Sequence, residues 1–211
     1  MTGSYITVSG TSCSEITINK SRFISYAFPC TEESDAVSFL QRIKEEHKTA
    51  KHHCYAYIIG ENSGIMRYSD DGEPGGTAGL PIMNAIRSKG IVNCCVIVVR
   101  YFGGVLLGTG GLVRAYTQSA QGALEAAGIA VMEWTSRNLC EIPYDVWDRF
   151  RYVAGQLPVK IENIEYGASV CFHLCIRMRD KDTVLPKLID AAGRSLSIDP
   201  LKDIFSAWNN E

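Results

Sequence analysis

A nearly continuous apolar run at residues 91–99, set between two segments rich in glycine and charge, limits the fold more than any other part of this sequence. Apolar residues on both faces are typical of a central strand that is buried on both sides. The first flanking segment, residues 68–81, reads YSDDGEPGGTAGLP, and the second, residues 96–116, reads VIVVRYFGGVLLGTGGLVRAY. Five glycines lie between Gly103 and Gly111, and glycine is tolerated where the chain needs a positive φ or a close backbone approach. We therefore expect a site in the loops beside a buried strand.

The periodicity of apolar residues predicts an α+β chain of two domains, residues 1–134 and 135–211. In the first domain we expect strands at 15–18, 22–28, 52–59, 65–68 and 91–99, and helices at 33–47, 80–89 and 112–127. In the second we expect strands at 138–143, 159–166, 168–178 and 194–198, and helices at 145–154 and 183–192. This β-α-β-β-α-β order is that of the ferredoxin-like split arrangement. Pro186 fits the last helix only within its first turn.

The bulk properties of the chain indicate a globular protein of the cytoplasm. Of 211 residues, 46% are hydrophobic and 21% charged, and no apolar run of about 18 residues predicts a membrane span. The start of the chain lacks a secretory signal, and the eight cysteines include no CxxC pair, so we expect reduced thiols. Lys+Arg against Asp+Glu gives 11 and 12 for residues 1–134, then 10 and 11 for 135–211. Binding of nucleic acid would therefore need a local basic patch.

The glycine loop at residues 103–114 has two competing interpretations. A strand that ends near Arg100, followed by glycines and a helix from Leu112, would direct free backbone N–H groups at a phosphate or carboxylate. The glycines could equally serve only a sharp turn and close packing, and neither the P-loop nor the GxGxxG motif fits. Arginine suits anions, and a cation in the first turn of a helix opposes the macrodipole, which favours a binding role for Arg114. The alternative for Arg100 and Arg114 is a salt bridge to the acidic loop.

The acidic loop and the histidines allow functional and structural interpretations. Three carboxylates within residues 70–73 could hold Mg²⁺ or transfer protons, but such groups more often cap helices or accept hydrogen bonds in turns. His52 and His53 point to opposite faces of their predicted strand, which is poor geometry for chelating one metal ion. A half-buried, hydrogen-bonded histidine is the favoured interpretation. The sequence contains no zinc-ligand set and no recognised nucleophile motif.

Four segments in order along the chain resemble the YigZ/Impact family. They are KSRFIS (20–25), HHCYAY (52–57), DDGEPGGTAGLPI (70–82) and VVRYFGGVLLGTGGLVRAYTQSA (98–120). The resemblance implies an N-terminal α/β domain like the second domain of a small-subunit ribosomal protein, and a C-terminal ferredoxin-like domain. It also implies a role in translation or its regulation, with RNA or the ribosome as the partner. The site residues that it carries over are His53, Asp70, Asp71, Glu73, Gly76, Arg100, Tyr101, Gly103, Gly104, Gly108, Gly110, Gly111, Arg114 and Tyr116.

Three functions remain open on the sequence. The leading hypothesis is a cytoplasmic, non-enzymatic binding protein in which the glycine loop, Arg100 and Arg114 contact RNA phosphates and Tyr101 or Tyr116 stacks on a base. The second is an enzyme or binding protein for a phosphorylated or carboxylated small molecule, with no cofactor other than Mg²⁺. The third is an interaction module, in which the strand face bearing Phe172, Leu174 and Ile176 forms a dimer surface. The sequence does not decide between monomer and dimer.

Overall fold

The apolar run at residues 91–99 supplies the middle strand of a five-stranded antiparallel sheet. The computed structural model describes residues 3–208, and β6 (Cys94–Tyr101) lies in the sheet between β3 and β4, in the order β2-β3-β6-β4-β5. Every residue from Cys94 to Val99 is fully buried, which confirms that both faces are covered. The strand begins three residues later than predicted, because Ile91–Asn93 form the approach to it. The other strands of this sheet are β2 (Ser12–Ile18), β3 (Ser21–Pro29), β4 (His52–Ile59) and β5 (Ile65–Ser69).

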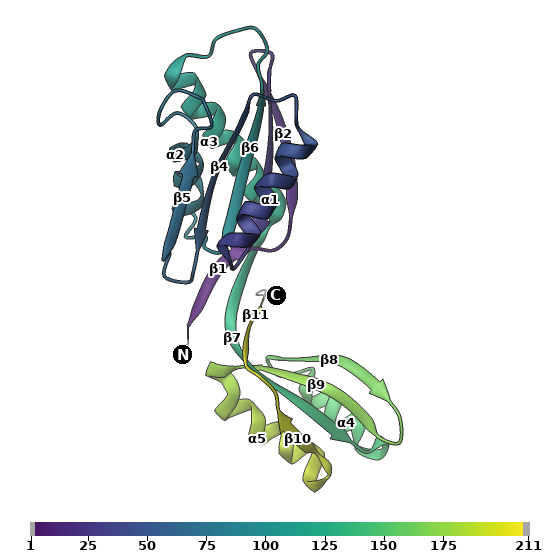
Figure 1. Ribbon diagram of the computed structural model, residues 1–211. Helices are drawn as coiled ribbons and strands as arrows, with labels where there is room; N and C mark the ends of the chain where they lie inside the picture. Colours follow the sequence, from purple (N-terminus) through teal and green to yellow (C-terminus); the bar gives the residue numbers. More distant parts are fainter. Residues whose placement is uncertain (1–2, 209–211) are drawn as a thin grey trace. The chain divides into compact units, whose positions relative to one another are not determined.

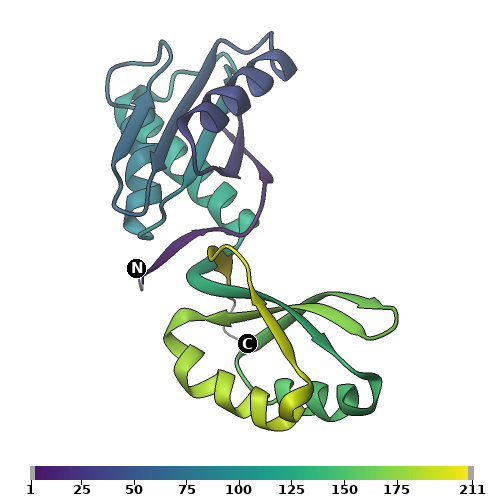
Figure 2. The same ribbon diagram turned by 60° about the horizontal axis from the view of Figure 1, so that its bottom comes forward.

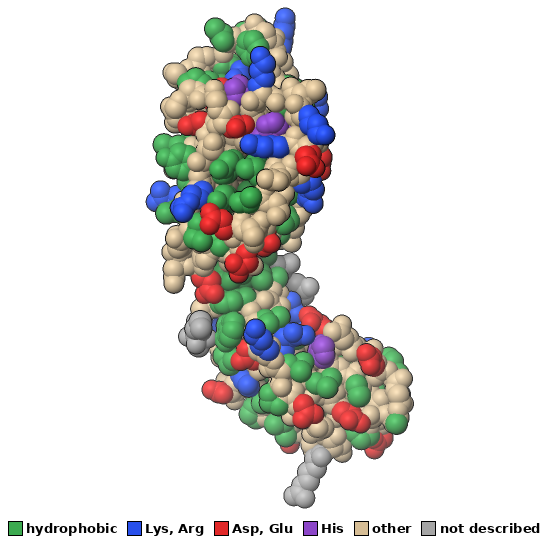
Figure 3. Space-filling view, viewed as in Figure 1, with side chains coloured by type: hydrophobic (Ala, Val, Ile, Leu, Met, Phe, Trp, Pro, Cys, Tyr) green, Lys and Arg blue, Asp and Glu red, His purple; other side chains and the backbone are tan. Residues whose placement is uncertain are grey.

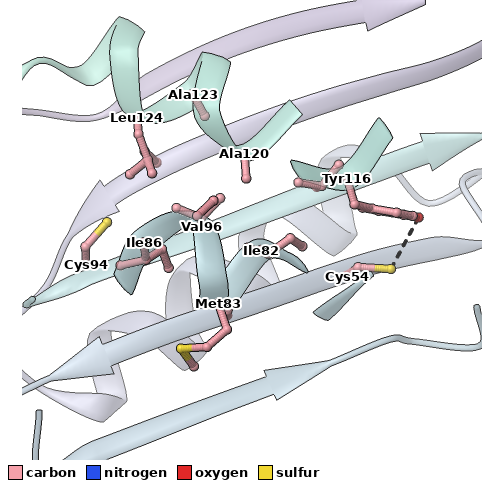
Figure 4. Packing of buried hydrophobic residues seen from close by; sticks show 14 of the residues in the cluster. Cys54, Ile82, Met83, Ile86, Cys94, Val96, Tyr116, Ala120, Ala123 and Leu124 are labelled. Carbon is pink, nitrogen blue, oxygen red and sulfur yellow. Dashed lines mark hydrogen bonds between the residues drawn. The ribbon is translucent and has the colours of Figure 1, made fainter. Parts of the chain in front are cut away.

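Three helices cover the two faces of this sheet (Figure 1). α2 (Gly79–Ser88) and α3 (Gly108–Ala127) pack on one face, where Ile82, Val96 and Tyr116 share a core (Figure 4). α1 (Glu33–Glu46) packs on the other face over a second apolar cluster. α3 begins four residues before the predicted start at Leu112, so three glycines predicted to be loop residues lie in the helix. Consequently Arg114 lies in the second turn of α3 and not in its first.

The chain divides into two compact units at Val131. Tyr5–Val131 form one unit, and Met132 onward form the other together with the first residues up to Ser4. The predicted boundary between residues 134 and 135 falls inside β7 (Ile129–Ile142), a strand that runs on across the division. Two strands were not predicted: β1 (Ser4–Val8), which pairs with β7, and β11 (Ile204–Ala207), which also pairs with β7.

The second unit has the predicted ferredoxin-like topology. Its elements are β7, α4 (Tyr144–Ala154), β8 (Val159–Tyr166), β9 (Val170–Arg177), α5 (Lys181–Ala192) and β10 (Ser197–Pro200). β7 pairs with β10 on one side and with β9 on the other, and β9 pairs with β8. α4 and α5 cover one face of this sheet (Figure 2). Pro186 lies inside α5, beyond its first turn, contrary to the prediction.

The proposed dimer face of the second unit is wrong. Phe172, Leu174 and Ile176 on β9 are each fully buried and pack against the helices in the core. The face of β9 that they occupy therefore has no surface to offer a second copy.

Two further expectations concern the whole described chain. Within residues 3–208, each helix is too short or too polar to cross a lipid bilayer. All eight cysteines are free thiols.

Candidate functional site

The two glycine-rich segments meet at one end of the five-stranded sheet and enclose a cleft there. β4 begins and β6 ends at this end of the sheet, where His52 of β4 pairs with Arg100 of β6. The cleft has a volume of about 430 Å³. Its lining residues are Lys51, His52, Glu73, Pro74, Arg100, Phe102, Leu106, Leu107, Gly108, Thr109 and Leu112. The acidic loop and the glycine loop thus lie close together, which the sequence alone did not show.

A buried cluster of three polar side chains forms the floor of the cleft. Arg100 Nη1 donates to both carboxylate oxygens of Glu73, at 2.8 and 3.1 Å, and the Tyr116 hydroxyl donates to Glu73 Oε1 at 2.7 Å. The side chains of Arg100 and Glu73 are 6% and 3% exposed, and Tyr116 is fully buried. The alternative that paired an arginine with the acidic loop is therefore correct for Arg100. Stacking of an RNA base on Tyr116 is contradicted, because its ring has no exposed face.

The Tyr116 hydroxyl and the Cys54 thiol lie side by side under this cluster. They are 3.4 Å apart, as the dashed line in Figure 4 marks, and the thiol is 3.0 Å from the carbonyl of Asp70. Burial raises the pKa of the Cys54 thiol to about 12, and burial together with Cys54 and Glu73 raises the pKa of Tyr116 well above its ordinary value. Both groups are therefore neutral at physiological pH, and neither is an activated nucleophile.

The aspartates of the acidic loop fix the local backbone. Asp70 accepts from the backbone N–H groups of Gly76, Ala78 and Gly79 at 2.8–2.9 Å, the last of these being the first residue of α2. Burial acts to raise the pKa of Asp70, but these three donors outweigh it and hold that pKa below its ordinary value. Asp71 accepts from the His53 backbone N–H at 2.7 Å. The favoured interpretation of these carboxylates as caps and turn acceptors agrees with these contacts.

Tyr101 and His53 lie on the opposite face of the sheet from Arg100. The Tyr101 hydroxyl is 2.9 Å from His47 Nδ1, and His47 Nε2 is 2.7 Å from the hydroxyl of Tyr26. His53 is buried, and its Nε2 lies 3.2 Å from the His47 carbonyl. These residues are thus separated from the cleft by the sheet itself, whereas His52 lines the cleft and hydrogen-bonds to the Asp71 carbonyl at 2.9 Å. In residues 3–208, no three His, Cys, Asp or Glu side chains are grouped so as to hold a metal ion.

Close approach and positive φ explain most of the predicted glycines. A Cβ on Gly103 would lie 2.0 Å from the backbone of Lys20, so this loop passes directly against the β2–β3 hairpin. Ser21 fastens the contact, because its hydroxyl accepts from the Gly103 N–H at 3.2 Å. Gly76, Gly104 and Gly108 have φ values of +74°, +82° and +69°. Gly110 and Gly111 have helical geometry and lie in the first turn of α3.

The start of α3 presents unpaired backbone donors to the cleft. The residue before the helix, Leu107, makes no capping hydrogen bond with its side chain, and Gly108 and Thr109 line the cleft. The first four N–H groups of a helix have no partner within it. Arg114 is exposed, and its Nη1 would lie 3.7 Å from a Cβ on Gly110, so its guanidinium reaches back over this turn. The interpretation of this loop as an anion site therefore keeps a physical basis, at a helix start earlier than predicted.

Several cleft residues were missed because no motif identified them. Phe102 and Leu106 line the cleft and are 52% and 85% exposed. Large exposed apolar side chains beside glycines are the signal that could have located them. On the face of the molecule that Figure 3 shows, acidic and basic side chains are intermixed in both units, in keeping with the balanced charge of the sequence.

Comparison with known proteins finds a matching family model and several relatives whose names agree with it. Residues 19–124 match the family described as Impact N-terminal domain. IMPACT family member YigZ of Escherichia coli (strain K12) is 33% identical, over 86% of this chain and 90% of its own. An IMPACT family member of Haemophilus influenzae is 39% identical over 78% of this chain and 80% of its own. IMPACT family member YvyE of Bacillus subtilis is 45% identical over 61% of this chain, a match that spans 59% of the length of YvyE. A crystal structure of a hypothetical protein has a TM-score of 0.62 at 30% identity, covering 96% of this chain and 99% of that one.

Proposed function

This chain belongs to the Impact family, and we propose that it is a non-enzymatic, cytoplasmic binding protein that acts in translation or its regulation by contacting single-stranded RNA at the cleft. The observation that carries the proposal is the joint presence, on one cleft, of an exposed aromatic ring and of unpaired donors. Phe102 offers the ring, and the first turn of α3 offers the backbone N–H groups. Proteins that bind single strands combine these two features, since bases stack on aromatic rings while cationic groups follow the phosphates.

One of the two arginines predicted to contact RNA phosphates already has an acidic partner. Arg100 is neutralised by Glu73, so it adds no net charge to the surface. Lys51 and Arg114 are exposed, one on the cleft wall and one over the first turn of α3. These two side chains therefore supply the local basic patch that a chain of net charge −2 needs in order to attract RNA.

Binding of a labelled single-stranded RNA, followed by fluorescence anisotropy over a range of salt concentrations, tests this proposal. We expect Lys51→Ala/Arg114→Ala to weaken binding and to lower the slope of log K against log salt by about 1.4, since each phosphate contact on a single strand contributes about 0.7. Arg87→Ala is the matched control, because Arg87 is exposed in the last turn of α2, at the far end of that helix from the cleft.

A second measurement connects the binding to translation. The wild-type protein should migrate with ribosomal subunits through a sucrose gradient at low salt and should be released by moderate salt. Equal RNA affinity in the double variant and in Arg87→Ala, or a wild-type protein that stays at the top of the gradient, would remove the basis of the proposal.

The size of the cleft favours a second candidate, a binding protein for a small phosphorylated or carboxylated molecule. At about 430 Å³, the cleft falls within the range of about 300–1,000 Å³ that is typical of ligand sites. A thermal-shift survey of such anions distinguishes the two functions. Stabilisation by a small anion with no RNA binding would favour this candidate.

A further inference from the structure

We infer that the cleft recognises one nucleotide by its phosphate monoester, with the phosphate on the first turn of α3 and the base against Phe102. This inference rests on the proposed function and specifies its ligand. The shared chemistry occurs at a phosphorylated end of an RNA strand and in a free mononucleotide, and the experiment below separates these sources.

The first observation is the open start of α3. This helix has 20 residues, and no side chain caps it. The four residues whose N–H groups lack a helical partner are Leu107, which precedes the helix, then Gly108, Thr109 and Gly110. The two glycines among them have no side chain that could cover the donors. Such a terminus carries a partial positive charge of about half a unit and is a common position for phosphate.

The second observation is independent of the helix and concerns Arg100. This side chain is 6% exposed and lines the same cleft, yet its Nε–H has no hydrogen-bond partner among the described residues. Nη1 is occupied by Glu73, while Nη2 has only Ser21 Oγ at 3.4 Å. A buried donor without a partner is destabilising, so an acceptor supplied by a ligand would restore the missing hydrogen bond.

The unused edge of Arg100 has the shape that recognises an oxyanion. Nε and Nη2 form the fork through which arginine binds a carboxylate or phosphate with two parallel hydrogen bonds. Arg22 shows this geometry within the same molecule, because its Nε and Nη2 bind the two oxygens of Glu15 at 2.6 and 2.9 Å. The guanidinium carbon of Arg100 lies 5.5 Å from the ring centres of both Phe23 and Phe102.

The size and lining of the cleft indicate a single nucleotide with a terminal phosphate. A volume of about 430 Å³ is near the lower end of ligand sites and suits one such unit better than a run of them. A phosphate monoester carries about −1.5 to −2 charges and three acceptor oxygens, more than an internal diester offers. The helix start, Lys51 and the free edge of Arg100 together provide more donors than a diester would use. Phe102 and the apolar wall then face the base.

The test compares RNA strands of one sequence that carry a phosphate at the 5′ end, at the 3′ end or at neither. We expect one phosphorylated strand to bind about tenfold more tightly than the strand with two hydroxyl ends, the effect of about one charge-assisted hydrogen bond. Adenosine monophosphate should compete with it, and adenosine should not. Competition by the mononucleotide without any preference among the strands would identify the free nucleotide as the ligand.

A substitution at Gly110, with a matched control far from the cleft, makes the test specific for the helix start. The residue is exposed, and an added Cβ would contact only the end of the Arg114 side chain, at 3.7 Å. Gly110→Asp places a carboxylate beside the free N–H groups, which stabilises a helix but repels phosphate, so it should abolish the tenfold preference at an unchanged or higher melting temperature. Gly64→Asp adds the same carboxylate in the loop between β4 and β5, at the end of β4 away from the cleft and with open space around its Cβ, and it should keep the preference.

The outcomes separate this inference from the proposed function. Equal binding of all three strands with no competition by adenosine monophosphate, or a preference that survives in Gly110→Asp, would overturn the inference while RNA binding stands. If adenosine monophosphate alone binds, the inferred phosphate position holds and the proposed RNA function fails. If neither the strands nor the mononucleotide bind, both fail.

Discussion

Replacing Arg100 by methionine should destabilise the unit formed by Tyr5–Val131 by about 3–5 kcal/mol, the usual cost of leaving a buried charge without its partner. The carboxylate of Glu73, whose side chain is 3% exposed, would keep only the hydroxyl of Tyr116 as a donor. Methionine has a similar length and no charge, so the substitution removes the ion pair and leaves most of the packing in place. The loss of stability therefore measures the cost of a buried Glu73 carboxylate that has no cationic partner.

Further substitutions in the same cluster should recover the lost stability in steps. Arg100→Met/Glu73→Met removes both charges, and the remaining cost should fall to about 1–3 kcal/mol, that of the unsatisfied Tyr116 hydroxyl. Adding Tyr116→Phe removes that hydroxyl as well, and the triple variant should approach the wild type, because apolar replacements of buried ion pairs are often neutral. If the three substitutions acted independently, their costs would add and the triple variant would be the least stable. Recovery of stability would show that the three side chains are energetically coupled.

Urea unfolding of the full chain measures these effects with an internal control. All three tryptophans, Trp134, Trp147 and Trp208, lie in the other unit, so their fluorescence follows that unit, whereas circular dichroism follows both. The variants should shift the dichroism transition and leave the fluorescence transition in place. A cost below about 1 kcal/mol for Arg100→Met, or a triple variant as unstable as the single one, would refute the reasoning.

Three shorter predictions concern the surroundings of the cleft. Asp70→Asn should lower the stability by about 1 kcal/mol at pH 7, as loss of a cap does. The folded-state pKa of Asp70 is lowered, so the stability that its carboxylate contributes is lost as the pH falls. The melting temperatures of wild type and variant should therefore converge below about pH 4. Gly103→Ala should prevent the glycine loop from docking and lower the melting temperature severely, whereas Gly75→Ala, with open space around its added Cβ, should change it little. Under native conditions at pH 8 a thiol reagent should modify the exposed Cys13 and spare Cys54, whose pKa is raised to about 12; modification of Cys54 at the same rate would contradict its burial.

The sheet of the first unit could be predicted closely because its side-chain alternation is unambiguous. β4 begins and ends at the predicted residues, and its two faces divide as the alternation requires: Cys54, Ala56 and Ile58 enter one core, while Tyr57 and Ile59 enter the other. The start of α3 was predicted four residues late, since three glycines in the first turn read as a loop by propensity. Short strands without alternation, β1 and β11, carried no local signal.

The two loops that enclose the cleft were identified from the sequence, but the contacts within them were not. Glycine density and charge identified the two loops, and their composition is a local property. Whether Arg100 faces a ligand or Glu73 depends on the fold, which brings residues 27 positions apart within 2.8 Å. Tyr101 and Arg100 are neighbours in sequence, yet strand alternation sends them to opposite faces, so a shared role for the two was never compatible with β6.

The position of β6 in the sheet has a consequence for biosynthesis. A nascent chain emerges with its N-terminus first, so β3 and β4 leave the exit tunnel before β6, the strand with which both of them pair. Until β6 and then α3 have been made, their edges stay unpaired and their apolar faces uncovered, which is the condition that favours aggregation. Folding of this half must therefore wait until synthesis has passed Ala127, the last residue of α3.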